Sequence, residues 1–547
     1  MIKGAVLRDA IISGANSIQN QKQAVDSLNI FPVPDGDTGT NMSMTMSAAR
    51  TELQKLSDEE NISVVADKAA SALLRGARGN SGVILSLLFR GFSKGLKGVE
   101  EADGTNIANA LTLGVDAAYK AVMKPTEGTI LTVARVAAEH AKAAASYNND
   151  ANYVWNEICD AAETALATTP DLLPVLKRAG VIDAGGQGLC YIFRGMQSVF
   201  NGGAIVTCEA ASTGEADVDS FKNIVAEFDE VINFTYCTEF IVEKENEKDP
   251  LELRAFLETI GDCVVVVDDD EIIKVHVHTD SPGNAITCAL TYGQLISSKI
   301  ENMREQHKNA GNGAPAKKKL ERVDPEIGVV GFVAVAAGDG LCSLFNDLGC
   351  LNVVTGGQTM NPSTDDILAA VQATPAETVF VLPNNKNIIM AAEQAVPIAD
   401  RRVVVLPTRT IPQGLAAMLA YDPDATEDEN SVEMFKAAEK VGTGSITFAA
   451  RDSEFDNKKI KEGDILALQN GKLSFLEKDI NKAAVKLTRQ MVNRDTNFVT
   501  LIYGEGITDA QAEAARATLE SKLSSNIEVT IVNGGQPVYY YLISVES

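Results

Sequence analysis

The 547-residue sequence has little positive charge and no long hydrophobic run. Lysine and arginine number 48 against 74 aspartates and glutamates, which gives a formal charge of −26. Such acidity excludes nucleic acid and anionic membranes as general partners and favours a basic patch on a partner. No apolar run approaches the length needed to cross a bilayer, and charges interrupt the apolar pattern of the first residues. We therefore expect a cytoplasmic protein with no integral membrane segment.

Cysteines are also few for a chain of this length. The eight cysteines are scattered and form no C-x-x-C pair. This spacing indicates neither a disulfide framework nor a zinc ribbon, so reduced thiols are expected. The length predicts about three or four domains, each able to bury its own core.

Residues 1–203 are predicted to be helical, because period-two patterns of β-branched residues are scarce there. The candidate helices are 5–28, 42–53, 64–74, 81–96, 107–123, 130–145, 153–166, 172–178 and 189–200. Four breaks between them, at 34–41, 75–82, 125–129 and 181–188, combine glycine with Asp, Asn, Ser or Thr at a helix start. Such breaks bring backbone N–H groups and the positive end of a helix to a phosphate. Each alone is more often a helix cap, but four in one domain favour a nucleotide site.

The first break, FPVPDGDTGTNM, holds Asp35 and Asp37 between two prolines and two glycines. These residues favour an extended backbone and tight turns. Two carboxylates this close repel unless a cation lies between them, and oxygen ligands beside a helix start suit Mg²⁺ with nucleotide phosphates. The alternative is an acidic turn in which Asp37 or Thr38 caps the next helix. Arg75 and Arg78 of the second break are candidates for neutralising phosphate.

The motifs FPVPDGDTGTNM, GARGNSGVIL, KPTEGTILTV and VIDAGGQGL resemble the nucleotide-binding domain family of dihydroxyacetone kinases. The resemblance implies an all-α helical barrel in which carboxylates, here Asp35 and Asp37, hold two Mg²⁺ ions against the phosphates of ATP. The implied nucleotide contacts are Thr38, Gly39, Thr40, Asn41, Gly79, Asn80, Ser81, Gly82, Thr129, Asp183, Gly185 and Gly186. The family has a further aspartate where this chain has Ile30. Asn29 or Asp26 would have to substitute, so the third metal ligand is left open.

Residues 204–307 are predicted to form a small α+β domain, with strands near 233–242, 263–267 and 272–278 and helices at 251–260 and 284–295. His276 and His278 lie two apart, which places both on one face of a strand. They are either a solvated or partner-facing pair, or Zn²⁺ ligands together with Cys237, with one coordination position left open. Without metal, both histidines could act in acid–base chemistry or phosphate contacts near the acceptor.

Residues 308–325 are predicted to be an exposed linker, and residues 326–547 a two-lobed α/β domain. Continuous apolar strands, each followed by a helix, indicate a parallel sheet covered on both faces. Ligands are expected at the loops that follow the strands, at 336–340, 355–359, 383–386 and 408–410. With TGGQTMNPSTDDIL after the second strand, this domain resembles the carboxy-terminal domain of bacterial fatty acid kinase catalytic subunits and the DegV-type lipid carriers.

The domain order resembles the family of those catalytic subunits over essentially the whole chain. The resemblance implies transfer of the γ-phosphoryl of ATP to a fatty acid carboxylate presented by a separate carrier protein of the DegV type, a reaction of phospholipid metabolism that gives an acyl phosphate. A carboxylate is already ionised and needs no general base, so positioning and charge neutralisation suffice. The alternatives are a dihydroxyacetone or small polyol kinase, and a non-enzymatic nucleotide-sensing scaffold. A homodimer is expected by family analogy and base rate.

Overall fold

The computed structural model describes residues 1–29, 37–122, 125–208, 234–246, 248–268, 272–302, 320–356, 361–455 and 458–547. Residues 1–208 and 320–547 form one compact unit, and residues 209–319 form a second. Across the described ranges, no helix combines the length and apolarity needed to span a bilayer.

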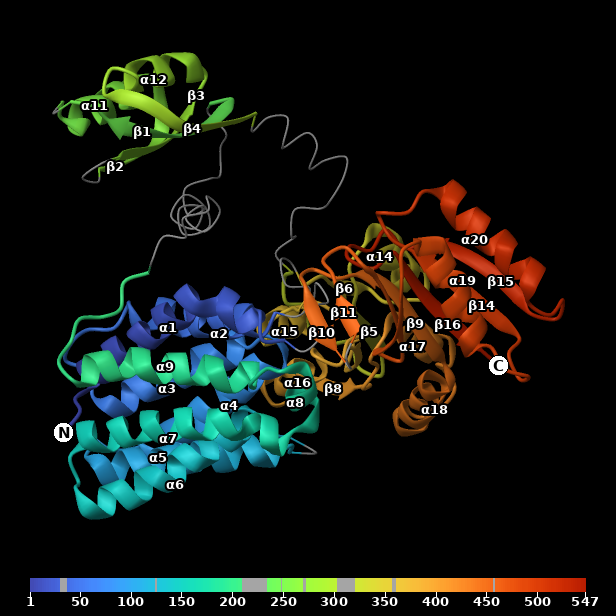
Figure 1. The fold of residues 1–547 in the computed structure, drawn as a ribbon, viewed down its shortest axis with the longest axis horizontal. Helices are drawn as coiled ribbons and strands as arrows, with labels where there is room; N and C mark the ends of the chain where they lie inside the picture. The colour runs from blue at the N-terminus through green and yellow to red at the C-terminus, as the bar shows by residue number, and fades with distance from the viewer. Residues whose placement is uncertain are drawn as a thin grey trace. The chain divides into compact units, whose positions relative to one another are not determined.

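The all-α prediction for the first part of the chain is confirmed. The helices described there are α1 Gly4–Asp26, α2 Thr38–Leu53, α3 Ile62–Gly76, α4 Gly79–Gly95, α5 Gly104–Ala121, α6 Ile130–Tyr147, α7 Ala151–Leu172, α8 Pro174–Ala179 and α9 Ala184–Phe200. Long helices such as α5, α6 and α7 run side by side (Figure 1). Trp155 of α7 is buried edge-on against Phe193 and Phe200 of α9, with ring centroids 5.5 and 4.9 Å apart. This aromatic group fixes α7 on α9.

Among the helices that follow the polar breaks, α2, α4 and α9 begin at Thr38, Gly79 and Ala184, ahead of the predicted starts at 42, 81 and 189. The glycines of the breaks therefore form first turns, although glycine is a poor helix former. A Cβ at Gly39 would lie 2.2 Å from the carbonyl oxygen of Lys22 in α1, and one at Gly188 would lie 2.6 Å from Sδ of Met42 in α2. Close packing of α1, α2 and α9 needs glycine, so tertiary contact overrides local propensity.

The C-terminal residues form the predicted parallel sheet and a second lobe. Strands β5 Val330–Val335, β6 Asn352–Val354, β7 Thr378–Leu382 and β8 Arg402–Val405 are parallel, in the order β6-β5-β7-β8. Their helical elements are α14 Asp339–Asp347, α15 Thr364–Gln372, α16 Ile389–Ala395, η2 Val396–Ile398 and α17 Ile411–Leu419. Every residue of β7 is buried, as expected of a strand covered on both faces. Helices α15 and α16 contact α3 and α4 of the helical part.

The second lobe contains a six-stranded sheet in the order β13-β12-β9-β16-β14-β15, in which β14 and β15 are parallel. Its strands are β9 Gly442–Phe448, β12 Ile465–Gln469, β13 Lys472–Glu477, β14 Phe498–Tyr503, β15 Glu528–Asn533 and β16 Tyr541–Glu546. The helices are α18 Glu427–Lys440, α19 Ile480–Met491 and α20 Asp509–Lys522, and a small hairpin is made by β10 Ser453–Phe455 and β11 Lys458–Ile460.

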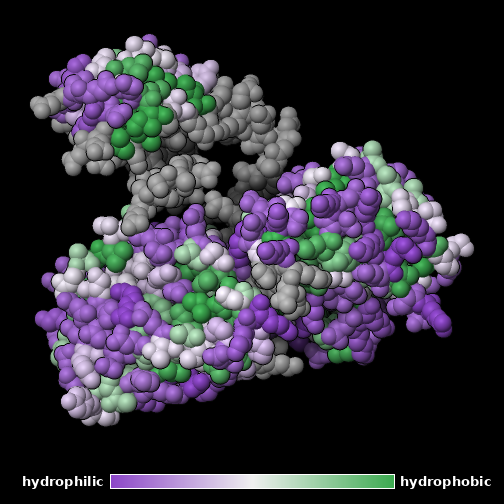
Figure 2. All heavy atoms as spheres, in the orientation of Figure 1, coloured by the Kyte–Doolittle hydropathy of each residue, from purple (hydrophilic) through white to green (hydrophobic). Residues whose placement is uncertain are grey.

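Figure 2 shows the surface of the chain from one side, and hydrophilic side chains cover much of that face.

The second compact unit is an antiparallel sheet with two helices. Its elements are β1 Tyr236–Lys244, α11 Pro250–Ile260, β2 Gly261–Asp268, β3 Ile272–Thr279, α12 Pro282–Ala289 and β4 Gly293–Asn302, and the strand order is β2-β3-β1-β4. The predicted α+β fold is confirmed, but the predicted helix 284–295 is wrong at its end. The helix α12 ends at Ala289, and the chain turns at residues 290–292 before β4 starts at Gly293 and pairs with β1. A Cβ at Gly293 would lie 1.8 Å from the carbonyl oxygen of Glu243, so this pairing needs glycine. Of the predicted linker, residues 308–319 lie outside the described residues.

Candidate functional site

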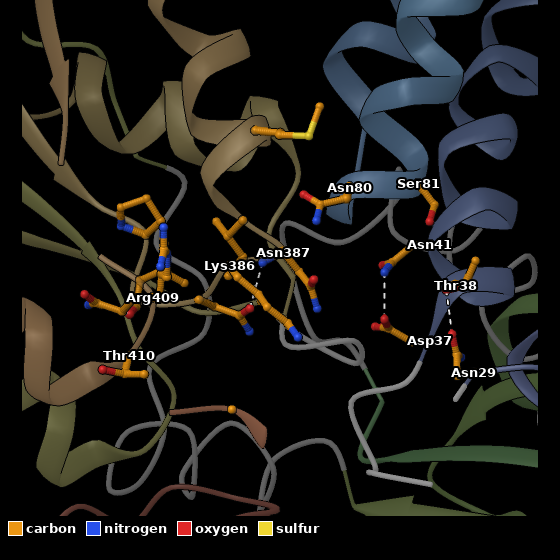
Figure 3. A pocket seen from close by; sticks show the side chains of 18 of the residues that line it. Asn29, Asp37, Thr38, Asn41, Asn80, Ser81, Lys386, Asn387, Arg409 and Thr410 are labelled. Atoms are coloured by element: carbon orange, nitrogen blue, oxygen red, sulfur yellow. Dashed lines mark hydrogen bonds between the residues drawn. The ribbon is translucent and has the colours of Figure 1, made fainter. Parts of the chain in front are cut away.

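A cavity of about 630 Å³ lies between the helical residues and the C-terminal α/β residues of the first compact unit (Figure 3). Its helical wall is built by all four polar breaks. Residues from each break that line it are Asp37, Thr38 and Asn41; Asn80 and Ser81; Thr126 and Thr129; and Asp183 and Gly185. Four segments far apart in the sequence thus meet at one place, as a nucleotide site requires.

The opposite wall comes from the parallel sheet. Residues that follow β5, β7 and β8 line the cavity, including Ala336, Ala337, Asn384, Lys386, Arg409 and Thr410. Parallel α/β sheets bind ligands at the carboxyl ends of their strands. The predicted ligand loops at 336–340, 383–386 and 408–410 therefore face the predicted nucleotide breaks across one cavity. Of the loop at 355–359, residues 357–359 lie outside the described residues.

Asp37 is the acidic residue of the first break that the structure describes, while Asp35 lies outside the described residues. Asp37 precedes α2, but its side chain does not cap that helix. Instead, its Oδ1 accepts a hydrogen bond from Nδ2 of Asn41 at 2.7 Å, and its Oδ2 accepts one from Nδ2 of Asn361 at 3.0 Å. The alternative of a capping Asp37 is not what the structure has, and the carboxylate belongs to the cavity wall.

Asp26 supplies the cap that Asp37 does not. Its Oδ1 accepts from the backbone N–H of Gly39 at 2.6 Å, and its Oδ2 accepts from Oγ1 of Thr40 at 2.7 Å. Burial raises the pKa of Asp26, while these hydrogen bonds act in the opposite direction. Asp26 is not among the residues that line the cavity, whereas Asn29 is. Of the two proposed substitutes at the Ile30 position, only Asn29 is placed for contact with a ligand.

The second break approaches the first through its glycines. Gly79 has a φ of +57°, a left-handed conformation that favours glycine, and a Cβ there would lie 2.7 Å from Nδ2 of Asn41. A Cβ at Gly82 would lie 2.4 Å from Oγ1 of Thr45. These residues let α4 start against α2, so that Asn80 lies beside Asn41.

Two amide oxygens at this junction are left without a partner. Oδ1 of Asn41 and Oδ1 of Asn80 are buried and have no hydrogen-bond partner among the described residues. An unsatisfied buried acceptor costs about 1–3 kcal/mol. Oxygen acceptors next to a carboxylate are the ligand type that Mg²⁺ prefers, so the donor set fits a magnesium ion or its bound water.

The third and fourth breaks are joined by Asp183, which caps α9. Its Oδ2 accepts from the backbone N–H of Gly186 at 2.7 Å, and a further backbone hydrogen bond comes from Ile130 at the start of α6. Burial raises the pKa of Asp183 to about 6, against the lowering effect of these two N–H groups. The starts of α6 and α9 are therefore held together at the cavity.

Five of the predicted nucleotide contacts do not line the cavity: Gly39, Thr40, Gly79, Gly82 and Gly186. The first two bind Asp26, and the last three lie where a Cβ would press against a neighbouring side chain. Their observed contacts cap helices and allow close helix packing. This packing positions the predicted residues that do line the cavity.

Arg75 and Arg78, expected at the phosphate, face α15 instead. Nη1 of Arg78 donates to the carbonyl oxygen of Asn361 at 2.9 Å, and Nη2 lies 3.4 Å from Asp366. Nη1 of Arg75 lies 3.8 Å from Asp365. Neither arginine lines the cavity. Sequence spacing could not reveal this, because the contacts depend on how the C-terminal residues dock.

The cations that line the cavity come from the C-terminal part. Among the described lining residues, Lys386 and Arg409 are the cationic ones. No ion pair joins either side chain to another described residue. Figure 3 shows Lys386 on the wall that faces Asp37 and Asn80. The sequence pointed to the loops that hold them, but not to these side chains.

In the second unit, the strand register pairs Cys237 with His278 and Glu239 with His276. Directly opposite residues of antiparallel strands share a face of the sheet. His278 is buried, with 5% of its surface exposed. The side chains of Cys237 and His276 lie outside what the structure describes, so the zinc site stays a prediction.

Three family models match successive parts of the chain. Residues 32–198 match the DAK2 domain, residues 233–310 the FakA-like middle domain of fatty acid kinase, and residues 331–546 the FakA-like C-terminal domain. Protein YloV of Bacillus subtilis is 42% identical over 559 residues, which cover 100% of this chain and 99% of that protein. An uncharacterized protein of Staphylococcus aureus, SAB1090, is 40% identical over 555 residues with the same coverage.

Two solved structures are similar over parts of the chain. The DegV family protein Cg2579 from Corynebacterium glutamicum is 14% identical with a TM-score of 0.32, and covers 40% of this chain and 97% of its own. The dihydroxyacetone kinase from C. freundii, in complex with AMP-PNP and Mg²⁺, is 19% identical with a TM-score of 0.29, and covers 36% of this chain and 34% of its own.

Proposed function

The chain belongs to the FakA-like family of fatty acid kinase proteins, and from this premise we propose that it transfers the γ-phosphoryl of ATP to a fatty acid carboxylate. The fatty acid would be presented by a separate lipid-carrier protein of the DegV type in the cytoplasm. The observation that carries the proposal is the meeting of four helix-start breaks with two cationic side chains in one cavity.

The nucleotide would bind on the helical wall. Asn80, Ser81 and Thr129 stand at or beside the starts of α4 and α6, where helix dipoles and short polar groups favour phosphate. Asp37, with Asp35, would hold Mg²⁺, and the unpartnered oxygens of Asn41 and Asn80 support a cation there. Bound Mg²⁺, as two ions by family analogy, would neutralise the charge of the β- and γ-phosphates. Asp183 caps α9 and so fixes the start of that helix, which lines the cavity at Ala184 and Gly185.

The acceptor would enter from the C-terminal wall. One carboxylate oxygen attacks the γ-phosphorus, the bond from that phosphorus to the β–γ bridging oxygen breaks, and ADP leaves with the electron pair. Because the carboxylate is already ionised, the chain needs to orient it and reduce its repulsion from the phosphates. Lys386 and Arg409 suit this role. Apolar lining residues such as Leu341, Leu468 and Leu542 suit an acyl chain.

We propose that the middle domain contacts the acceptor carboxylate. A zinc ion on Cys237, His276 and His278, or the histidines alone, would orient or screen the acceptor carboxylate. The strand register that sets Cys237 opposite His278 supports the zinc hypothesis. A homodimer is also part of the proposal.

The test is an acceptor assay with purified full-length protein, ATP and Mg²⁺. We expect acyl phosphate, trapped with hydroxylamine, only when both fatty acid and a DegV-type carrier are present. Asp35→Asn and Asp37→Asn should abolish turnover, because the metal ligands lose their charge. Asp495→Asn, at an exposed position far along the chain, is the matched control.

Two other outcomes would contradict the proposal. Rapid phosphorylation of free dihydroxyacetone without a carrier would favour the small polyol kinase, which the DAK2 match also accommodates. Nucleotide binding without turnover of any acceptor would favour the nucleotide-sensing scaffold.

A further inference from the structure

Two side chains of the C-terminal residues contact the two ends of the segment that holds Asp35. This segment joins Asn29, which follows α1, to Asp37, which precedes α2. Arg451, between β9 and β10, donates from Nη1 to the carbonyl oxygen of Asp26 at 2.9 Å. Its Nη2 donates to the carbonyl oxygen of Asn29. The incoming end of the segment is thus held by one forked guanidinium.

Asn361 contacts the outgoing end. Its side chain is 1% exposed, and its Nδ2 donates to Oδ2 of Asp37 at 3.0 Å. The backbone carbonyl of Asn361 in turn accepts from Arg78 at 2.9 Å. Beyond it, the backbone N–H of Thr364 donates to the carbonyl oxygen of Ala77 at 3.2 Å. Two hydrogen bonds therefore attach the chain around Asn361 to Ala77 and Arg78, which join α3 to α4.

The side chains of Asn41 and Asn361 contact different oxygens of Asp37. Asn41 donates to Oδ1 and Asn361 donates to Oδ2. Two amide donors fix the rotation of the carboxylate while preserving its negative charge. Hydrogen-bond donors of this kind hold metal-ligating carboxylates in place, and their loss typically weakens metal affinity about 10- to 100-fold.

We propose that Asn361 and Arg451 are positioning residues for the Mg²⁺ site around Asp37, so that the C-terminal domain completes a kinase site otherwise built by helices. This inference rests on the proposed nucleotide function and adds a specific dependence to it. Because coupling between two contacts is reciprocal, binding of Mg²⁺ and nucleotide also strengthens the attachment of the C-terminal residues to the helical part.

The test compares full-length wild type with Asn361→Ala and Arg451→Lys, each checked for an unchanged melting profile. Lysine keeps the charge but cannot bridge two carbonyls with a planar fork. Arg494→Ala is the control, since Arg494 is exposed in the same domain. ADP affinity is titrated by calorimetry at increasing Mg²⁺ and in EDTA. Hydrogen exchange of residues 26–29 and 37–41 is followed in protein free of both metal and nucleotide.

Both variants should need on the order of 10-fold more Mg²⁺ for the same ADP affinity, with ADP binding in EDTA unchanged. Amide exchange in residues 26–29 and 37–41 should be faster than in wild type and in Arg494→Ala, even without ligand. Wild-type Mg²⁺ dependence and wild-type exchange in either variant would remove that residue from the proposal. If the wild type itself binds no Mg-ADP, the proposed function fails, which is a different result from failure of the positioning role.

Discussion

Asp183→Asn is predicted to stabilise the helical domain at neutral pH but not at pH 4. Burial raises the folded-state pKa of Asp183 from 3.8 to about 6. A raised carboxyl pKa means that the folded state holds its proton longer than the unfolded state does. Stability is therefore lost as pH rises from about 4 to about 6, and it stays lost above that range. Asparagine keeps the acceptor oxygen for the N–H of Gly186 but carries no charge.

The size of the effect follows from the shift. About 2 pKa units at roughly 1.4 kcal/mol each give an upper value of about 3 kcal/mol. Because the carboxyl is only partly buried by surface area, solvent reduces this, and we expect a gain of about 1–3 kcal/mol at pH 7. At pH 4 the aspartate is protonated in the folded state, so the gain should disappear.

The assay is urea unfolding at pH 4 and pH 7, followed by tryptophan fluorescence. Trp155 is the single tryptophan of the chain and is buried against α9, so its signal reports the domain that contains Asp183. Asp150→Asn, at the exposed N-cap of α7, controls for the substitution itself. A stability change of the same size at both pH values would refute the reasoning, as would destabilisation at pH 7.

Three further predictions concern the cavity and the middle domain. Gly79→Ala should weaken ATP binding at least tenfold and lower the free energy of unfolding by about 1–2 kcal/mol, because the new Cβ would press on Asn41. Gly98→Ala is the control, since Gly98 also has a positive φ but has no neighbouring atom within 4 Å, so only backbone strain is expected. Equal ATP affinity in the two variants would contradict a role for the contact with Asn41. Lys386→Ala and Arg409→Ala should each raise KM for the acceptor about tenfold in steady-state kinetics, with little change in the Kd of ATP. A weaker Kd for ATP with an unchanged KM for the acceptor would instead assign these side chains to the nucleotide. Purified protein should contain about one zinc per chain by elemental analysis and lose it in His278→Ala; zinc-free wild type would reject that site.

Local chemistry explains how much of the fold and the site could be predicted. Helix starts are marked by glycine and short polar residues within a few positions, and parallel strands by continuous apolar runs. These signals identified the helical domain, the α/β domain and the four breaks. Of the residues predicted to contact the nucleotide, Gly39 and Gly186 lie where helices approach each other and do not line the cavity.

The rest could not be predicted because it depends on contacts between distant segments. Arg78 is a cation in a glycine-rich break at a helix start, which is typical of a phosphate ligand. It nevertheless contacts Asn361 and Asp366, which are close to it only because α15 docks on α3. The same docking sets Asn361 against Asp37. No periodicity or motif in either segment encodes that pairing.

The sequence by itself determined the fold classes, their order along the chain, and a set of polar breaks suited to phosphate and Mg²⁺, because caps, turns and hydrophobic periods are properties of neighbouring residues. Only the tertiary structure decided that these breaks share one cavity with Lys386 and Arg409, and that Asn361 and Arg451 hold the ends of the segment around Asp35. These relations arise when separate hydrophobic surfaces pack together. Packing brings polar side chains face to face over distances that no local pattern records.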